Sequence, residues 1–354
     1  MEVQLIELKS EISAGTRGAS RSIDALIMAS LNLKLTEDLR REKDWNADEW
    51  TLEEVEKREE KYQDRDMPWN FFRFHKRINV PNRNELVYEP VRYRWAKRIE
   101  GLIDVYHNMV TALQPVLKEK GKFPVVLAGD HGTAGATIKG IKKAFPEERI
   151  GVIWIDAHGD LHSPYTTPSG NMHGMPLCIA LSEDNQNQRR RELATKTFEK
   201  WEELKNVGYE GPAVQPEDIV LLGVRSLEFQ ERALIEERGI RMIHVREVRE
   251  EGARKAAHHA LEILADCDKV YVSFDIDSID STISSGTGTP VPDGLFPEEA
   301  RGLLNTLAIE PRVCCMEMVE VNPFLDPHGN RTGEIAFDLL YDMVKTIENE
   351  RTHE

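Results

Sequence analysis

The sequence predicts an α/β protein in which a doubly wound parallel sheet lies between two layers of helices. From Pro124 onward, short apolar segments alternate with amphipathic ones. The apolar segments are mostly continuous, which is typical of strands buried on both faces. Acids and histidines follow directly after three of these strands. Ligands bind at the carboxyl ends of the strands in folds of this class, so the predicted site lies at that edge of the sheet.

Strand and helix positions follow from this alternation. Strands are expected at residues 125–128, 152–155, 219–222, 240–245, 270–274 and 313–321. Helices are expected at residues 133–145, 228–238, 249–265, 297–307 and 333–350. An order in which strands and helices alternate favours parallel strands joined by crossover helices.

The first 120 residues differ in character and are expected to form an N-terminal helical elaboration. Residues 36–66 are densely charged and contain Trp45 and Trp50, and further aromatic residues follow. A solvated helical insertion over 36–90 is the favoured interpretation, because charge runs usually form solvated faces. A subunit contact anchored by the aromatic residues is the alternative. With no internal repeat or low-complexity linker, residues 1–354 are expected to form a single domain.

Composition excludes some classes of function. The formal net charge is −16 and the pI is about 5.3, so the chain has no excess of cations to neutralise the phosphates of a nucleic acid. No segment approaches the roughly 18 apolar residues of a membrane span, and no signal peptide is evident. The four cysteines are expected to be reduced core residues: Cys178, Cys267, Cys314 and Cys315. We therefore expect a cytoplasmic protein that binds neither nucleic acid nor membrane.

The residues after three strands indicate a metal site. These residues are His131, Asp156, His158, Asp160, Asp275 and Asp277. A carboxylate directly after a buried strand is costly unless it is paired or bound to a metal. Residues two apart in an extended chain point the same way, so the Asp-x-His-x-Asp and Asp-x-Asp segments each present their acids on one face. One such pair alone is more often a capping contact, but three together indicate bound divalent cations.

The types of side chain at these positions narrow the choice of metal ion. Two histidines and four aspartates form an oxygen-dominated set, which suits Mn²⁺ better than zinc sites rich in thiolates. The ligands are too many for one catalytic ion. Two bridged ions are therefore expected, and such a centre generates hydroxide at neutral pH.

The three motifs in this order resemble the ureohydrolase superfamily and, within it, the arginases. The resemblance covers about residues 121–345, and residues 160–176 match the arginase signature without a gap. It implies a three-layer arginase-like sandwich that assembles as a homo-oligomer, usually a trimer or hexamer. It also implies a small guanidinium substrate, most simply L-arginine, which is split to L-ornithine and urea by two Mn²⁺ ions per subunit.

The resemblance also assigns roles to individual residues. One metal would be held by His131, Asp156, Asp160 and Asp275, and the other by Asp156, His158, Asp275 and Asp277. His173 matches the proton-shuttle histidine of the family, and Asp160 would relay a proton from the hydroxide. Glu320 matches the acid that pairs with the guanidinium, for which a carboxylate is geometrically suited. Thr289 lies in a Thr-Gly-Thr-Pro loop that the family places beside the active site.

Departures from the family pattern occur at the positions that bind the α-carboxylate and the α-amino group of the substrate in the family. His162 stands in place of an asparagine that binds the α-carboxylate, whereas Ser169 and Asn171 are retained. Ser226 and Glu228 stand in place of two acids near the α-amino group. A histidine could still meet a carboxylate, and Glu228 an ammonium.

These departures leave the substrate open. Agmatine, a guanidino acid or formiminoglutamate is the alternative to arginine. A non-catalytic binding or scaffold protein of the same fold is a third hypothesis, but it predicts damaged metal motifs, and all six positions are intact. Smaller changes place Gly132 where the family has a serine and Ser281 where it has a proline.

Overall fold

The computed structural model describes residues 1–43 and 63–351, and an all-parallel sheet of eight strands runs through its centre. The strand order is β2-β1-β3-β8-β7-β4-β5-β6. The strands are β1 (Glu2–Leu8), β2 (Lys76–Asn79), β3 (Lys122–Ala128), β4 (Ile150–Ile155), β5 (Ile219–Leu222), β6 (Arg241–Ile243), β7 (Lys269–Asp275) and β8 (Val313–Val319). The predicted doubly wound parallel sheet is confirmed.

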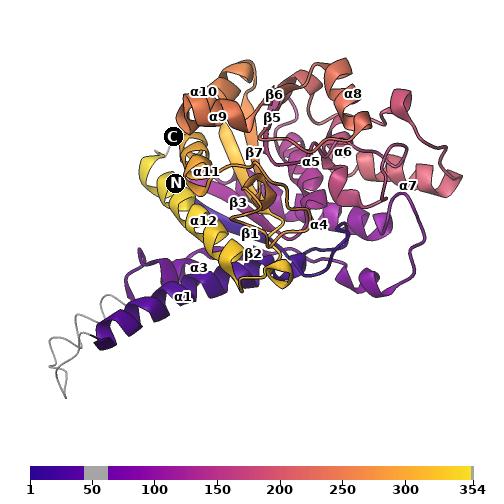
Figure 1. Cartoon of the computed structure of the whole chain (residues 1–354). Helices are drawn as coiled ribbons and strands as arrows, with labels where there is room; N and C mark the ends of the chain where they lie inside the picture. Colours follow the sequence, from indigo (N-terminus) through magenta and orange to yellow (C-terminus); the bar gives the residue numbers. More distant parts are fainter. Residues whose placement is uncertain (44–62, 352–354) are drawn as a thin grey trace.

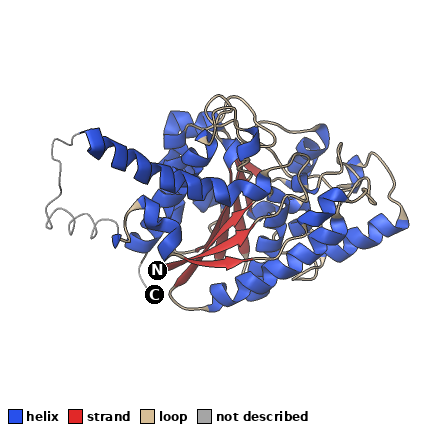
Figure 2. Cartoon of the chain, turned by 90° about the horizontal axis from the view of Figure 1, so that it is seen from below, coloured by secondary structure: helices blue, strands red, loops and turns tan. Residues whose placement is uncertain are grey.

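Helices cover both faces of the sheet (Figure 1). On one face lie α1 (Ser22–Lys43), α9 (Val245–Glu251), α10 (Ala253–Ile263), α11 (Pro297–Ala308) and α12 (Arg331–Glu350), with the short α3 (Phe71–Phe74) beside them. On the other lie α4 (Ile99–Lys118), α5 (Ala134–Ala144), α6 (Pro176–Leu181), α7 (Thr195–Lys205) and α8 (Phe229–Arg238). Figure 2 shows the strands enclosed between these two layers. Among the described residues, no helix is both long and apolar enough to span a bilayer.

The strand side chains divide between two apolar cores, one on each face. Val125 and Leu127 of β3 pack into the core on the α12 side, whereas Val126 and Ala128 pack into the core on the α4 side. All six residues of β4 are buried. This two-sided burial explains why the strands are continuous apolar runs in the sequence.

The six predicted strands are present, and two of them end earlier than predicted. β5 occupies the predicted residues, but β6 ends at Ile243 because Val245 already begins α9. β8 ends at Val319 rather than at residue 321. The single helix predicted over 249–265 is wrong, since α9 and α10 are separated at Gly252, whose φ of 95° leaves the helical region.

The amino-terminal residues contribute to the sheet itself, which the sequence analysis did not predict. β1 pairs with β2 on one side and with β3 on the other, and Leu5 is fully buried. The polar residues of β1 interrupt the apolar pattern of a buried strand in the sequence, but they have partners in β2. Gln4 donates to the carbonyl of Lys76 over 2.7 Å, and Glu7 forms an ion pair with Arg77. The charged segment with Trp45 and Trp50 lies mostly outside the described residues, so its predicted role stays a prediction, as does the single domain.

The path of the chain through the sheet creates the site. After β3 the chain crosses over the places of β8 and β7 to form β4, and β7 and β8 later fill the gap. The carboxyl ends of β3, β8, β7 and β4 therefore lie side by side at the point where the strand order reverses. Crevices form at such switch points.

Replacing Leu5 with alanine tests whether β1 belongs to the core. The Leu5 side chain is 0% exposed, so its truncation is expected to lower the free energy of unfolding by about 3 kcal/mol. Urea denaturation measures this change. Val91→Ala, at a residue 45% exposed, is the control and should change stability by less than ~0.5 kcal/mol. Equal, small effects in both variants would mean that β1 is peripheral.

Candidate metal centre

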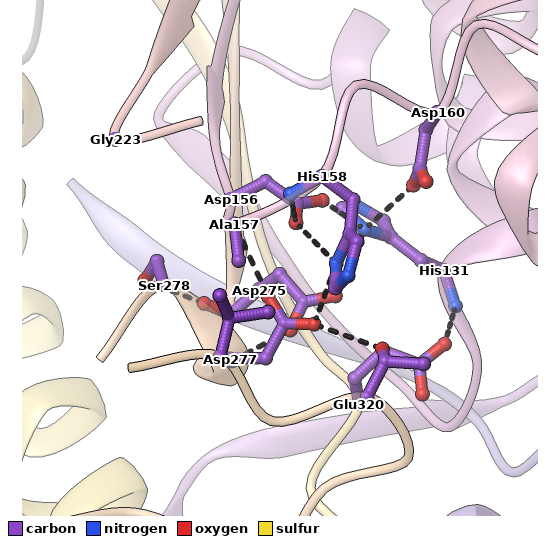
Figure 3. A network of polar contacts seen from close by, with 12 residues as sticks. His131, Asp156, Ala157, His158, Asp160, Gly223, Asp275, Asp277, Ser278 and Glu320 are labelled. Atoms are coloured by element: carbon purple, nitrogen blue, oxygen red, sulfur yellow. Dashed lines mark hydrogen bonds and ion pairs between the residues drawn. The ribbon is translucent and has the colours of Figure 1, made fainter. Parts of the chain in front are cut away.

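The predicted metal ligands converge at the carboxyl edge of the sheet (Figure 3). His131 begins a single 3₁₀ turn three residues after Ala128, the last residue of β3. Asp156 directly follows β4, and Asp275 is the last residue of β7. Asp277 lies in the 3₁₀ turn that follows β7. Parallel pairing brings these three strand ends to one edge, as the sequence predicts.

The side chains form two groups that share one aspartate. His131, Asp156 and Asp275 make one group, and Asp156, His158 and Asp277 make the other; within each group the candidate ligand atoms lie within 4.8 Å of one another. The carboxylate of Asp160 approaches the first group, with Oδ2 3.3 Å from His131 Nδ1. This arrangement could hold two cations with Asp156 between them.

His131 is held in place from two sides. Its Nε2 lies 2.8 Å from Ser273 Oγ, and its ring stacks on the Trp154 indole with 4.0 Å between centroids and 3° between planes. Its Nδ1 faces oxygens of Asp156 at 3.0 Å and Asp275 at 3.1 Å. That buried nitrogen nevertheless has no hydrogen bond of acceptable geometry. A lone pair directed at carboxylate oxygens fits a cation placed between them.

Backbone amides orient the carboxylates. His158 N donates to Asp156 Oδ1 and Asp277 N donates to Asp275 Oδ1, each over 2.7 Å. Trp154 Nε1 donates to Asp156 Oδ2 over 3.0 Å. Partners of this kind fix the direction of ligand lone pairs before a metal arrives.

The buried acids oppose one another's ionisation. Burial, followed by the charges of neighbouring aspartates, raises the pKa of Asp160 and of Asp275 well above the ordinary range. Burial also opposes ionisation of Asp156, but the close contacts with His131 and His158 outweigh it and lower the pKa of that carboxyl. Concentrated negative charge in a buried place is what divalent cations relieve. The donor set and its electrostatics therefore fit a binuclear metal site.

A cavity of about 290 Å³ opens beside the cluster. It is lined by all six predicted metal ligands, by the predicted proton shuttle His173, and by most of the predicted substrate contacts, namely His162, Ser169, Asn171, Ser226, Glu228 and Thr289. Ser226 lies against His158 through a β-bridge, and Thr289 donates to Asp277 over 3.1 Å. Residues predicted from distant parts of the sequence thus share one cavity.

Glu320 is the predicted site residue that does not line this cavity. It is 2% exposed and follows β8 with a left-handed φ of 65°. Its Oε1 accepts a hydrogen bond from His131 N at 2.8 Å and faces His173 Nδ1 at 3.2 Å. Burial opposes protonation of His173, but the contact with Glu320 outweighs it and raises the pKa of His173. Glu320 therefore joins the metal cluster to the predicted proton shuttle.

The amino-acid end of the cavity contains an acid that the sequence analysis missed. His162 Nε2 lies 3.1 Å from Glu228 and 3.6 Å from Glu231. Glu231 is 2% exposed, accepts a hydrogen bond from Leu161 N, and has its pKa raised by burial to about 7. The hydrogen bond from His162 lowers the pKa of Glu228 to about 2. His162 is thus engaged with acids of the protein.

Sequence signals existed for two of the missed residues. Glu231 is three residues beyond Glu228 at the start of α8, which is the spacing of a capping box, and its side chain accepts from Glu228 N. Ser273 stands two residues before Asp275 in an otherwise apolar strand, so it shares a face with that ligand.

Two departures from the family pattern are accommodated locally. A Cβ on Gly132 would lie 2.3 Å from Ser13 Oγ, so this position has no room for a larger residue. Ser281 N donates to the carbonyl of Val291 over 3.2 Å, a bond that proline could not make.

Known proteins resemble this chain over most of its length. The family model described as Arginase family matches residues 5–345. The arginase of Bacillus subtilis is 35% identical over 248 residues, which are 70% of this chain and 77% of that protein. The arginase of Bacillus caldovelox is 35% identical over 245 residues, or 69% of this chain and 75% of its own.

Solved structures of arginases and of a related enzyme have the same fold as this chain. A 1.7 Å structure of Bacillus subtilis arginase superposes with a TM-score of 0.73 at 27% identity, covering 97% of this chain and 98% of that one. A formimidoylglutamase of Bacillus subtilis shares the fold, with a TM-score of 0.68 at 18% identity and coverage of 99% and 88%. The matching family model and the arginase relatives together show that this chain belongs to the arginase family of hydrolases.

Proposed function

We propose that this protein hydrolyses L-arginine to L-ornithine and urea with two Mn²⁺ ions. The observation that carries the proposal is a single cavity that is lined both by the six metal-ligand candidates and by Ser169, Asn171 and Glu228. A guanidinium at the metal side and an amino-acid group at the other would together use both ends of this cavity.

The proposed metal ligands are His131, Asp156, Asp160 and Asp275 for one ion and Asp156, His158, Asp275 and Asp277 for the other. When bound, a pair of Mn²⁺ ions supplies an activated water nucleophile at neutral pH and offsets the charge of the carboxylates. The oxygen-dominated donor set favours Mn²⁺ over zinc.

The remaining chemistry falls to the protein's own groups. Asp160 lies at the cavity with its carboxylate facing His131, where it could accept the proton that the attacking water loses. His173 lines the cavity, and its contact with Glu320 raises its pKa despite burial, so it could donate a proton to the leaving amine. Glu320 would also attract the guanidinium, although in the structure its Oε1 is engaged by His131 N and His173.

A second candidate substrate is one that lacks the α-amino acid group, such as agmatine, or a guanidino acid or formiminoglutamate. The placement of His162 favours it, because this histidine binds Glu228 and Glu231 rather than facing the cavity free of partners. Retention of Ser169 and Asn171 at the cavity favours arginine.

We further propose that the chain acts in the cytoplasm as a homo-oligomer, a trimer or a hexamer. All four cysteines are free, which agrees with a reducing compartment. Phe229 and Phe324 are 69% and 73% exposed, which suits contacts between subunits. Sedimentation of the purified protein measures the assembly.

A substrate panel tests the function. With Mn²⁺ added, urea release from L-arginine is expected to exceed that from agmatine and guanidino acids by at least about tenfold in kcat/KM, because only arginine fills both ends of the cavity. Formamide release from formiminoglutamate is measured in parallel. Activity confined to a substrate without the α-amino acid group would overturn the arginine assignment.

The variant Asp277→Ala tests the metal assignment. It is expected to bind one Mn²⁺ per subunit in place of two and to lose at least about 100-fold in kcat, because Asp277 is proposed as a ligand of one ion only. Metal content by mass spectrometry and circular dichroism separate loss of metal from loss of fold. Asp266→Asn, whose side chain is 88% exposed, should keep both ions and full activity.

The variant His173→Asn tests the proton donor. It is expected to lower kcat by about 100-fold while leaving two metals bound and KM within about threefold, since the proposed role lies in proton transfer. His107→Asn, a histidine on the exposed side of α4, serves as the control. Unchanged kcat in His173→Asn would remove this residue from the mechanism.

A further inference from the structure

A lysine outside the motifs contacts the amino-acid end of the cavity. Lys97 lies just before α4, and its Nζ donates to Asn171 Oδ1 over 2.9 Å. Asn171 lines the cavity beside Ser169, whereas Lys97 stands behind it and does not line the cavity. No sequence motif points to Lys97, because its relevance depends on contacts with a loop more than 70 residues away.

The backbone of Lys97 is anchored on the same loop. Lys97 N donates to the carbonyl of Gly170 over 2.9 Å. Gly170 has a φ of 78°, and a Cβ there would lie 2.0 Å from the carbonyl oxygen of Arg94, so the two segments are in close backbone contact. The adjacent Trp95 carries the guanidinium of Arg191 over its ring at 3.7 Å. The ammonium group of Lys97 is therefore held against Asn171 by a rigid support.

This contact determines how the Asn171 amide is turned. An ammonium group only donates hydrogen bonds, so the atom facing it must be the carbonyl oxygen of the amide. The amide nitrogen Nδ2 then lies on the other side, against Gly15, where an added Cβ would come within 2.5 Å of it. Within the described residues, Nδ2 donates no hydrogen bond. Because Asn171 lines the cavity, this unpaired donor is available to an acceptor on a substrate bound there.

Charge is distributed unequally across this end of the cavity. In the described part of the chain, no acid forms an ion pair with Lys97, so its positive charge is uncompensated there. Burial is the main cause that lowers the pKa of Lys97, and the nearby positive charges of Arg98 and Arg17 lower it further. The acids Glu228 and Glu231 line the same cavity and carry negative charge. A zwitterionic group would therefore be oriented with its carboxylate toward Asn171 and its ammonium toward Glu228.

We propose that Lys97 is a positioning residue that makes this site select substrates with a carboxylate at the end remote from the guanidinium. Lys97 acts by fixing the Asn171 amide as a donor and by adding positive charge behind it. His162 contacts Glu228 and Glu231 and is therefore not free to bind the substrate carboxylate. Lys97 takes over part of that recognition. The inference rests on the proposed function and adds a selectivity residue to it.

The test compares L-arginine with L-argininamide, in which a neutral amide replaces the carboxylate. Lys97→Met keeps the aliphatic stem of the side chain but removes the charge and the donor. It is expected to lower kcat/KM for L-arginine about tenfold, mainly through KM, and that for L-argininamide less than about twofold. Lys97→Arg should recover most of the preference, and Lys120→Met, on the surface at the opposite end of β3, should leave it unchanged.

Further measurements separate positioning from a general loss of structure. Inhibition by L-ornithine and by L-ornithinamide gives the same comparison without turnover, and it should show the same roughly tenfold loss for the carboxylate ligand alone. In the Asn171→Ala background, Lys97→Met should have little additional effect, because the lysine acts through that amide. Melting temperature and manganese content should match those of the unmodified protein.

The possible outcomes distinguish a failure of the role of Lys97 from a failure of the proposed function. An equal fall for arginine and argininamide in Lys97→Met, or no fall for either, overturns the role of Lys97 while leaving the arginase function in place. An unmodified protein that releases no urea from L-arginine overturns the proposed function and the selectivity role together. A loss confined to the carboxylate substrate, reversed in Lys97→Arg, supports the proposal.

Discussion

The structure depends on one electrostatic problem, the gathering of four buried aspartates, the buried His131 and the partly buried His158 at the carboxyl edge of the sheet. Asp275 and Asp277 are each no more than 2% exposed, and Asp156 is shared between both groups. Such charges repel one another unless a cation lies among them. Backbone amides and the Trp154 indole hold the carboxylates in this unfavourable arrangement. Rigid strand ends thus hold the carboxylates together despite their repulsion, in an arrangement that fits bound divalent cations.

Much of this could be predicted from the sequence because it follows from local rules. Parallel strands buried on both faces are continuous apolar runs, and an acid directly after such a run is conspicuous. The proposed metal ligands lie at three strand ends, and neighbouring ligands after β4 and at the end of β7 are only two residues apart in the sequence. β1 escaped prediction because Gln4 and Glu7 interrupt its apolar pattern, and only their partners in β2 make them acceptable in a strand.

The amino-acid end of the cavity was harder to predict because it depends on contacts between distant loops. His162 could be recognised as a departure, but its pairing with Glu228 and Glu231 depends on how α8 begins. The contact from Lys97 to Asn171 arises only when the segment before α4 packs on the loop after β4. Chemistry at the metal side is carried by motifs, whereas selectivity is carried by the packing of loops. Related enzymes can therefore share metal ligands and differ in substrate.

The position of β8 in the sheet has a consequence for how the molecule is made. β8 pairs with β3 on one side and with β7 on the other, although it is the last strand to leave the ribosome. Until it arrives, β1 and β3 have no link to the strands of the other half, and His131 is separated from Asp156 and Asp275. Sheets closed by such long-range pairs fold slowly, and their unpaired edges attract other chains in the meantime. We therefore expect the proposed metal ligands of the nascent chain to stay divided between two incomplete half-sheets until β8 pairs, so that metal is captured late in folding.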